Sequence, residues 1–312
     1  MALLPHRPVL VACSLFLLSC SEPSPRGPVP DPPVHPPGGP ILDSVPVLRV
    51  PLVVHVLHEG QAIGDGPNHT LAFVQRQIEL LNDDFRRRSG TRGFNDHPSG
   101  ADARIEFFLA RTDPLGQSTS GVTWTDITAI ENPVDPGSRF DHAAHFAYWD
   151  PGRYVNIWSV PFPAEARGLY LGEATGPLTD LPGADLFLKG EPEGREGILI
   201  NADHFGESLV DSDYDLGRTL THEMGHYLGL LHLWGGGSCE DNDFCSDTPP
   251  VDQAISGCPG TVVLACNGEP AMTANYMTFS ADRCMNVFTV EQVERMRTVL
   301  RTSPYRTFEV KP

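Results

Sequence analysis

The fold of this chain is decided by residues 222–232, which read HEMGHYLGLLH. Two histidines four positions apart on a helix lie on one face, so the imidazoles of His222 and His226 can reach a single ion. Gly229 lets the backbone leave helical geometry, because glycine tolerates dihedral angles that other residues avoid. The chain can then swing His232 back as a third nitrogen ligand. The spacing therefore predicts one metal ion held by three histidines.

Glu223 follows the first of these histidines, so its carboxylate can lean over the metal and hold a water molecule there. Three neutral nitrogen ligands leave the fourth tetrahedral position open, which is typical of a catalytic rather than a structural zinc site. The pattern predicts that Glu223 is a general base that takes a proton from the metal-activated water. The alternative is a chance HExxH on a surface helix, and the longer pattern leaves little room for it.

Composition and charge limit the classes of function. The chain has 312 residues, of which 40% are hydrophobic, so it can bury one large core or two modest ones. Its formal net charge of −18 and its pI near 4.9 argue against a nucleic-acid binder, which needs basic patches to meet phosphates. We interpret the acidic balance as a solubility feature rather than as a sign of the substrate.

The N-terminal residues 1–20 have the pattern of a signal peptide. Their apolar stretch, 9–18, is too short to span a bilayer. Residues 17–20, LLSC, resemble the lipobox of bacterial lipoproteins, in which the cysteine becomes the lipidated first residue. We therefore expect export from the cytoplasm and a cell-surface or outer-membrane lipoprotein, whose membrane contact is a lipid on Cys20. The alternative is an ordinary secretory signal and a secreted protein.

The rest of the chain divides near Val47. Residues 21–46 are rich in proline and glycine and predict an extended tether without a core of its own. Beyond the tether, apolar patterns predict strands at 50–57, 104–110, 154–160 and 197–201, and helices at 70–87, 216–233 and 290–300. The strand at 197–201 is a candidate edge on which an extended peptide could pair. After residue 235 the chain is rich in loops.

A second motif follows the histidines. Residues 275–280 read NYMTFS and resemble the Met-turn of metzincin metallopeptidases, a loop that places a methionine beneath the three histidines as an apolar floor. A lone methionine usually only fills a core. Met277, however, comes 45 residues after His232 and within that motif, so we interpret it as the floor of the site.

Several stretches around these motifs resemble the pappalysin family of metzincins, over roughly residues 47–300. They are GRTLT at 217–221, HLWG at 232–235, DTP at 247–249, GCP at 257–259, FT at 288–289 and YVNIW at 154–158. The resemblance implies a metzincin-type α/β (α+β) fold and a metallopeptidase catalytic domain over 47–308. Its upper subdomain (47–234) would hold a twisted, mostly parallel sheet and the active-site helix. Its lower subdomain (235–308) would be irregular and disulfide-linked, with a C-terminal helix.

The resemblance also implies a zinc endopeptidase that hydrolyses peptide bonds in proteins or peptides. Two residues depart from the family pattern. Phe279 stands where the family usually has tyrosine, whose hydroxyl can help to stabilise the tetrahedral intermediate, so the rate is in question. Cys245 stands where relatives tend to carry an aliphatic residue. We keep two rival functions: a decayed peptidase that retains zinc as a structural ion, and a zinc amidase or deacetylase acting on cell-wall material.

The cysteines outside the signal peptide lie in the lower subdomain. By resemblance we pair Cys239 with Cys266 and Cys258 with Cys284, which leaves Cys245 as a free thiol. Four cysteines allow three connectivities, so this pairing rests on the family rather than on the spacing. No cysteine lies between Ser21 and Ser238, so we expect no latency in which a prosegment thiolate occupies the metal. We also expect a monomer.

Two further sites are open to more than one interpretation. The resemblance suggests a structural calcium ion at Asp241, Asp243, Asp247 and Thr248, and the alternative is a solvated acidic loop. In metzincins the segment after the Met-turn helps to form the pocket for the residue that follows the scissile bond. Arg283 lies in that segment and would favour an acidic side chain there. Alternatively, Arg283 turns outward and pairs with a carboxylate such as Asp282 or Glu291.

Overall fold

The computed structural model describes residues 45–131, 138–163, 170–187, 195–207 and 212–308. The predicted signal peptide, its lipid site at Cys20, and residues 21–44 of the predicted tether lie outside these ranges. Within the described ranges, no helix is both long and apolar enough to cross a membrane.

A six-stranded sheet forms the centre of the described chain. Its strands are β1 (Leu48–His58), β2 (Ile105–Leu109), β3 (Val122–Asp126), β4 (Val155–Val160), β5 (Gly172–Ala174) and β6 (Ile198–Asn201). The order is β2-β1-β4-β6-β5, and the long β1 pairs with β2 along its first half and with β3 along its second half. Every pair is parallel except β5 with β6, which confirms the predicted mostly parallel sheet.

The strand predicted to be a free edge is not one. β6 lies between β4 and β5, and the edge is the short antiparallel strand β5. β5 has no local strand signal, because its three residues, Gly-Glu-Ala, have neither the alternation nor the β-branched side chains that mark a strand. A free edge is decided by which strands pair across the sheet, and that information is not local.

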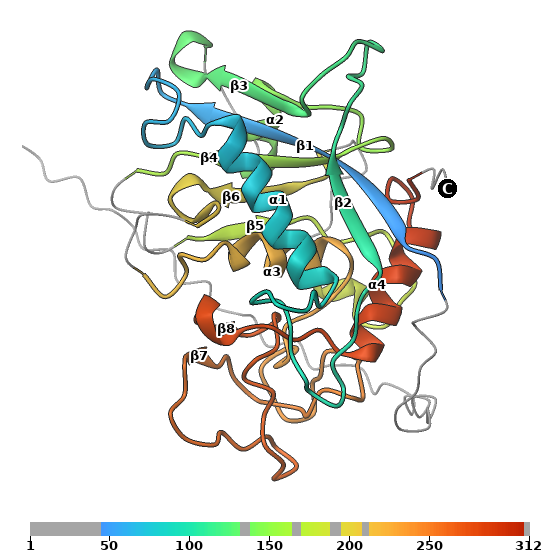
Figure 1. Cartoon of the computed structure of the whole chain (residues 1–312). Helices are drawn as coiled ribbons and strands as arrows, with labels where there is room; N and C mark the ends of the chain where they lie inside the picture. The colour runs from blue at the N-terminus through green and yellow to red at the C-terminus, as the bar shows by residue number, and fades with distance from the viewer. Residues whose placement is uncertain (1–44, 132–137, 164–169, 188–194, 208–211, 309–312) are drawn as a thin grey trace, which may run out of the picture. The chain divides into compact units, whose positions relative to one another are not determined.

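Helices cover both faces of the sheet. They are α1 (Leu71–Phe85), α2 (Arg139–Phe146), α3 (Arg218–Tyr227) and α4 (Val290–Thr302). Val54, Val56 and the same face of β4 and β6 pack in one core with apolar residues of α1 and α3. Leu57, Trp158 and Leu199 point to the opposite face and pack against α2. Figure 1 shows α1 crossing the sheet, with α3 below it next to β5.

Helix α3 is shorter than predicted. It ends at Tyr227 rather than near Leu233, because Gly229 has φ 92° and so takes a left-handed conformation that side-chain-bearing residues rarely adopt. The carbonyl of Met224 still accepts the N–H of Leu228 at 2.9 Å. The chain then turns away from the helix axis, which brings His232 back toward it.

The part of the chain after residue 235 is mostly loop, with a short parallel pair of strands, β7 (Ser256–Gly257) and β8 (Phe279–Ser280). Disulfides join Cys239 to Cys266 and Cys258 to Cys284, and Cys245 is a buried free thiol. The chain closes with α4, whose N-terminus is capped by Thr289 and Gln292 in a reciprocal pair of hydrogen bonds. Val293 and Met296 of α4 belong to the same core as α1 and α3.

Candidate metal centre

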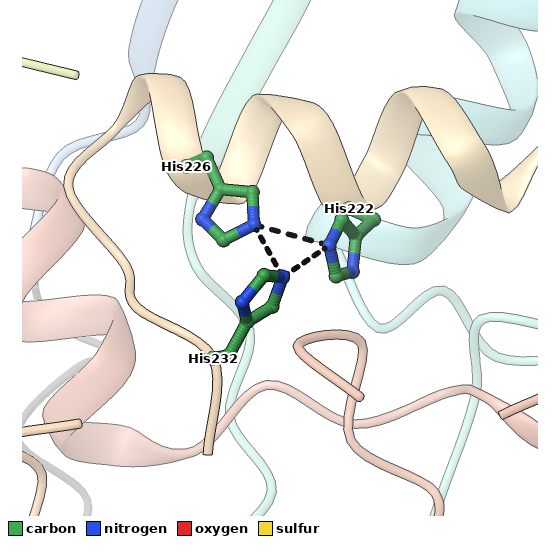
Figure 2. A group of neighbouring side chains, drawn as sticks. All are labelled: His222, His226 and His232. Carbon is green, nitrogen blue, oxygen red and sulfur yellow. Dashed lines mark hydrogen bonds between the residues drawn. The ribbon is translucent and has the colours of Figure 1, made fainter. Parts of the chain in front are cut away.

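Three imidazole nitrogens meet beside helix α3 (Figure 2). The Nε2 atoms of His222 and His226 are 3.1 Å apart, and each lies within 3.2 Å of Nε2 of His232. A zinc ion bound tetrahedrally at about 2.0 Å needs nitrogens about 3.3 Å apart. The spacing of the three atoms therefore suits one zinc ion.

Backbone carbonyls determine which nitrogen of each helical histidine carries the proton. Nδ1 of His222 lies 2.6 Å from the carbonyl oxygen of Tyr276, and Nδ1 of His226 lies 2.8 Å from that of Leu230. A carbonyl oxygen only accepts hydrogen bonds, so each Nδ1 is the donor. Both Nε2 atoms then carry bare lone pairs aimed at the same point, which is the arrangement that a metal ligand requires.

Burial keeps the imidazoles neutral. It lowers the pKa of His222 to about 3 and that of His226 to about 4, and it also lowers the pKa of His232. The ring of His232 stacks on Trp234, with centroids 4.1 Å apart, and Phe279 meets it edge-on at 5.0 Å. Two aromatic rings therefore hold the third ligand, which follows a turn rather than lying on the helix.

Met277 packs directly beneath this group. It is fully buried, and a Cβ added at Gly225 would lie only 2.5 Å from its sulfur atom. Gly225 lies between the two helical histidines, so the thioether reaches the helix backbone there. The loop is held by Asn275, whose Oδ1 accepts the N–H of Met277 at 2.9 Å and whose amide bonds Gln292 at 2.8 Å.

A buried carboxylate that was not among the predicted site residues fixes the other side of α3. Asp84, near the end of α1, accepts hydrogen bonds from Arg218 at 3.1 Å and from Thr221 at 2.7 Å. The side chains of Asp84 and Arg218 are each only 1% exposed. No local signal distinguishes Asp84 from the other acidic residues of α1, because its partners lie more than a hundred positions away.

A cavity of about 550 Å³ opens at the three histidines, and the side chain of Glu223 forms part of its wall. Burial, and then the charge of Glu173, raises the pKa of Glu223 to about 8. The remaining walls come from the edge strand β5, the segment that follows it, the loop before α3 and the segment after the Met-turn. They include Gly172, Glu173, Leu186, Tyr214, Phe279 and Asp282.

Comparisons with known proteins agree with this geometry. Residues 191–301 match the family described as pregnancy-associated plasma protein-A. The chain is 32% identical to an extracellular metalloprotease of Arthroderma benhamiae over 78% of its own length and 69% of that protein. The chain belongs to the pappalysin family. Mature mirolysin of Tannerella forsythia, solved in complex with a cleaved peptide, superposes on 84% of this pappalysin and 95% of mirolysin, with a TM-score of 0.68 and 32% identity.

Other relatives match over a shorter region. Extracellular metalloprotease 1 of Coccidioides posadasii is 38% identical over 132 residues, which cover 42% of this pappalysin and 45% of that protein. The matched region thus spans less than half of the Coccidioides protein. The curated relatives are named as extracellular metalloproteases, so membership places this pappalysin in a metallopeptidase family of metzincin type.

Arg283 does not line the cavity of this pappalysin, and the predicted acid-binding pocket is wrong. Its guanidinium bonds the carboxylate of Asp213 at 2.5 Å, and both side chains are about half exposed, at 57% and 47%. The outward orientation is the correct alternative, but the partner is neither Asp282 nor Glu291. The N–H of Asp282 bonds the carbonyl of Asp213 at 2.7 Å, so the two segments run close enough for this ion pair.

In the segment after the Met-turn, the charged residue that lines the cavity is Asp282, not Arg283. Its Oδ2 atom accepts the backbone N–H groups of Leu216 at 2.8 Å and Arg218 at 3.1 Å. Its Oδ1 atom is buried and has no hydrogen-bond partner among the described residues. Burial raises the pKa of this carboxyl to about 6, so it is mostly ionised at neutral pH. The cavity therefore has an acidic wall where a basic one was predicted.

The described residues contain no second group of three metal-binding side chains like the histidines. In particular, Asp241, Asp243 and Asp247 do not bring their carboxylates together in this way. Asp241 accepts a hydrogen bond from Ser238 instead, at 2.9 Å. A calcium ion in this loop therefore stays a prediction.

Proposed function

We propose that this pappalysin is a zinc-dependent endopeptidase that hydrolyses peptide bonds in proteins. One observation carries the proposal: the Nε2 lone pairs of His222, His226 and His232 converge in a cavity whose wall includes the carboxylate of Glu223. Three neutral nitrogens with an open fourth position suit catalytic zinc rather than structural zinc. The metalloprotease names of its relatives support the same function.

Each residue of the site has a distinct role in this proposal. When bound, zinc supplies a Lewis acid that activates a water and polarises the scissile carbonyl. Glu223 is the general base, which takes the proton of the attacking water and then delivers it to the leaving amine nitrogen. Glu223 acts in its ionised form, which the positive charge of a bound zinc ion would favour against the effect of burial. Met277 supports the two helical histidines from below.

The substrate would lie along the edge strand β5. Its outer side has no neighbouring strand in the described sheet, so its backbone groups can pair with an extended peptide. Gly172 and Glu173 of this strand line the cavity together with Glu223. A peptide paired with β5 would therefore pass directly over the histidines. The cleaved peptide named with mirolysin is consistent with a cleft of this kind.

We further propose that residues 47–308 form the catalytic domain, divided near residue 235 into the upper and lower subdomains. The fully buried Asn275 and Gln292 tie the Met-turn to α4 within the lower part. Export, lipidation of Cys20 and the monomeric state remain predictions. Calcium binding also remains a prediction. Two buried carboxylate oxygens support it, Oδ2 of Asp243 and Oδ1 of Asp247, because neither has a hydrogen-bond partner among the described residues.

Incubation with two substrate classes tests the function. A denatured protein and purified cell wall are each treated with the chain, with and without a zinc chelator. We expect chelator-sensitive cleavage of the protein at internal bonds. Chelator-sensitive release of material from the cell wall alone would indicate an amidase or a deacetylase instead. A protein that retains zinc and acts on neither substrate would be a decayed, non-catalytic relative.

A further inference from the structure

We propose that Gly172 of β5 is a positioning residue for Glu223, because only a residue without a side chain leaves room for the carboxylate beside the metal site. This inference rests on the proposed function. It concerns the wall of the site that β5 forms, where β5 and α3 are in direct contact. Figure 1 shows the two elements side by side.

The contact between the two residues is close. A Cβ added at Gly172 would lie 2.8 Å from Cγ of Glu223 and 3.2 Å from its Oε1, and 3.0 Å from Cδ1 of Ile200. The optimal separation of two nonbonded carbon atoms is about 3.5–4.0 Å, and a Cβ atom almost never lies within 3.0 Å of another heavy atom. Even a methyl group at position 172 would therefore push the Glu223 side chain away from β5.

The backbone does not itself require glycine here. Gly172 is absent from the described glycines with positive φ, so alanine fits its backbone conformation. Gly197 is a contrasting case, in which glycine serves only the packing of the fold. A Cβ at Gly197 would meet the ring of Trp158 and the carbonyl oxygen of Asn156. At Gly172 the atoms in the way belong to the proposed general base and to Ile200.

Packing has to position Glu223, because hydrogen bonds do not. Within the described ranges, no protein group donates a hydrogen bond to its carboxylate, although His222 and His226 on the same helix are each held by a backbone carbonyl. The side chain is buried between α3 and β5. A steric change on the β5 side therefore moves the carboxylate, while the histidines keep their own hydrogen bonds.

The test is the variant Gly172→Ala, measured against wild type on one protein substrate. We expect kcat to fall about 100-fold, as for a reacting group displaced by about 1 Å, with KM within a factor of two. Zinc content and melting temperature should match wild type, because neither the ligands nor the backbone is changed. Gly260→Ala is the matched control, since its φ is not positive and no atom lies within 4 Å of its added Cβ. Its kcat should be unchanged.

Two double variants separate the role of Glu223 from that of Ile200. Ile200→Val removes Cδ1, so it should not restore kcat to Gly172→Ala if Glu223 is the group displaced. Gly172→Ala combined with Glu223→Gln should be no slower than Glu223→Gln alone, because a positioning residue has nothing left to position.

Several outcomes would overturn the inference. They are wild-type kcat in Gly172→Ala, its rescue by Ile200→Val, an additive loss in the double variant, or failure of Gly172→Ala to fold or bind zinc. In the last case Gly172 would serve the fold rather than the base. An inactive wild type is a different result, because it would refute the proposed function itself.

Discussion

Asp282 accepts the backbone N–H of Arg218, the first residue of helix α3, at 3.1 Å. The bond joins the segment after the Met-turn to the start of the metal-binding helix, and it uses only one oxygen of the carboxylate. The other oxygen is buried without a hydrogen-bond partner among the described residues. A buried carboxylate oxygen in this state costs free energy until a donor reaches it.

A basic substrate side chain could supply that donor. We expect cleavage before lysine or arginine to be preferred over cleavage before acidic residues, because a cation can pair with Asp282 inside the cavity. Asp282→Asn should lower kcat/KM for such substrates at least tenfold, and Arg283→Ala, which removes an exposed ion pair, should change the preference little. Profiling of cleavage sites in a peptide library measures both. A preference for acidic residues after the cut would contradict this assignment.

Glu223→Gln should separate catalysis from metal binding. The amide cannot accept the proton of the attacking water, so we expect kcat to fall by about 10²–10⁴-fold, the range attributed to general acid–base catalysis. Zinc content should stay at the wild-type level, because the three histidines are unchanged. Metal analysis and steady-state kinetics on one preparation give both quantities. Full turnover in this variant would show that the mechanism is wrong.

The buried ion pair between Asp84 and Arg218 should matter far more than the neighbouring, partly exposed pair of Asp83 with Arg88. Asp84→Ala leaves a buried guanidinium without its countercharge, which typically costs about 3–5 kcal/mol of the free energy of unfolding. Asp83→Ala is the adjacent control, since Asp83, whose side chain is 12% exposed, pairs with Arg88, whose side chain is 50% exposed and so stays in contact with water. That pair should contribute less than about 1 kcal/mol. Urea unfolding with the disulfides intact measures the difference, and equal effects would contradict the prediction.

Asp243 should make stability depend on pH. Burial raises its pKa from 3.8 to about 7, so the folded state binds this proton more tightly than the unfolded state. The stabilisation is therefore complete below pH 4 and is lost as the pH rises through about 7, by up to about 4 kcal/mol at 1.36 kcal/mol per pKa unit.

The comparison of wild type with Asp243→Asn between pH 4 and pH 8, without calcium, checks this dependence. Asparagine keeps a side-chain oxygen for the hydroxyl of Thr248, which donates to Asp243 at 2.7 Å. The variant should therefore lose the pH dependence of stability and keep that hydrogen bond. Added calcium should oppose the loss at high pH in wild type if the predicted site exists. An equal slope in both proteins would show that another group is responsible.

Much of the site could be predicted because its information is local. The spacing of His222 and His226 places both on one face of any helix that forms there, and Gly229 marks where that helix must stop. The family resemblance supplied Met277 and the cysteine pairs that the structure contains. The strands β1 and β6 were found because buried parallel strands are rich in apolar residues, and β4 was found because its residues alternate.

Other features of the site were decided only by the tertiary structure, because they depend on contacts between segments far apart in the chain. The order of the strands made β5 the edge and left Gly172 against Glu223. Asp213, seventy positions before Arg283, turned that guanidinium outward, while Leu216 and Arg218 held Asp282 at the cavity. Hydrogen bonds and close contacts of this kind form between residues that are near in space but far apart in the chain. The periodicity of a sequence indicates only which residues share a face of one helix or strand.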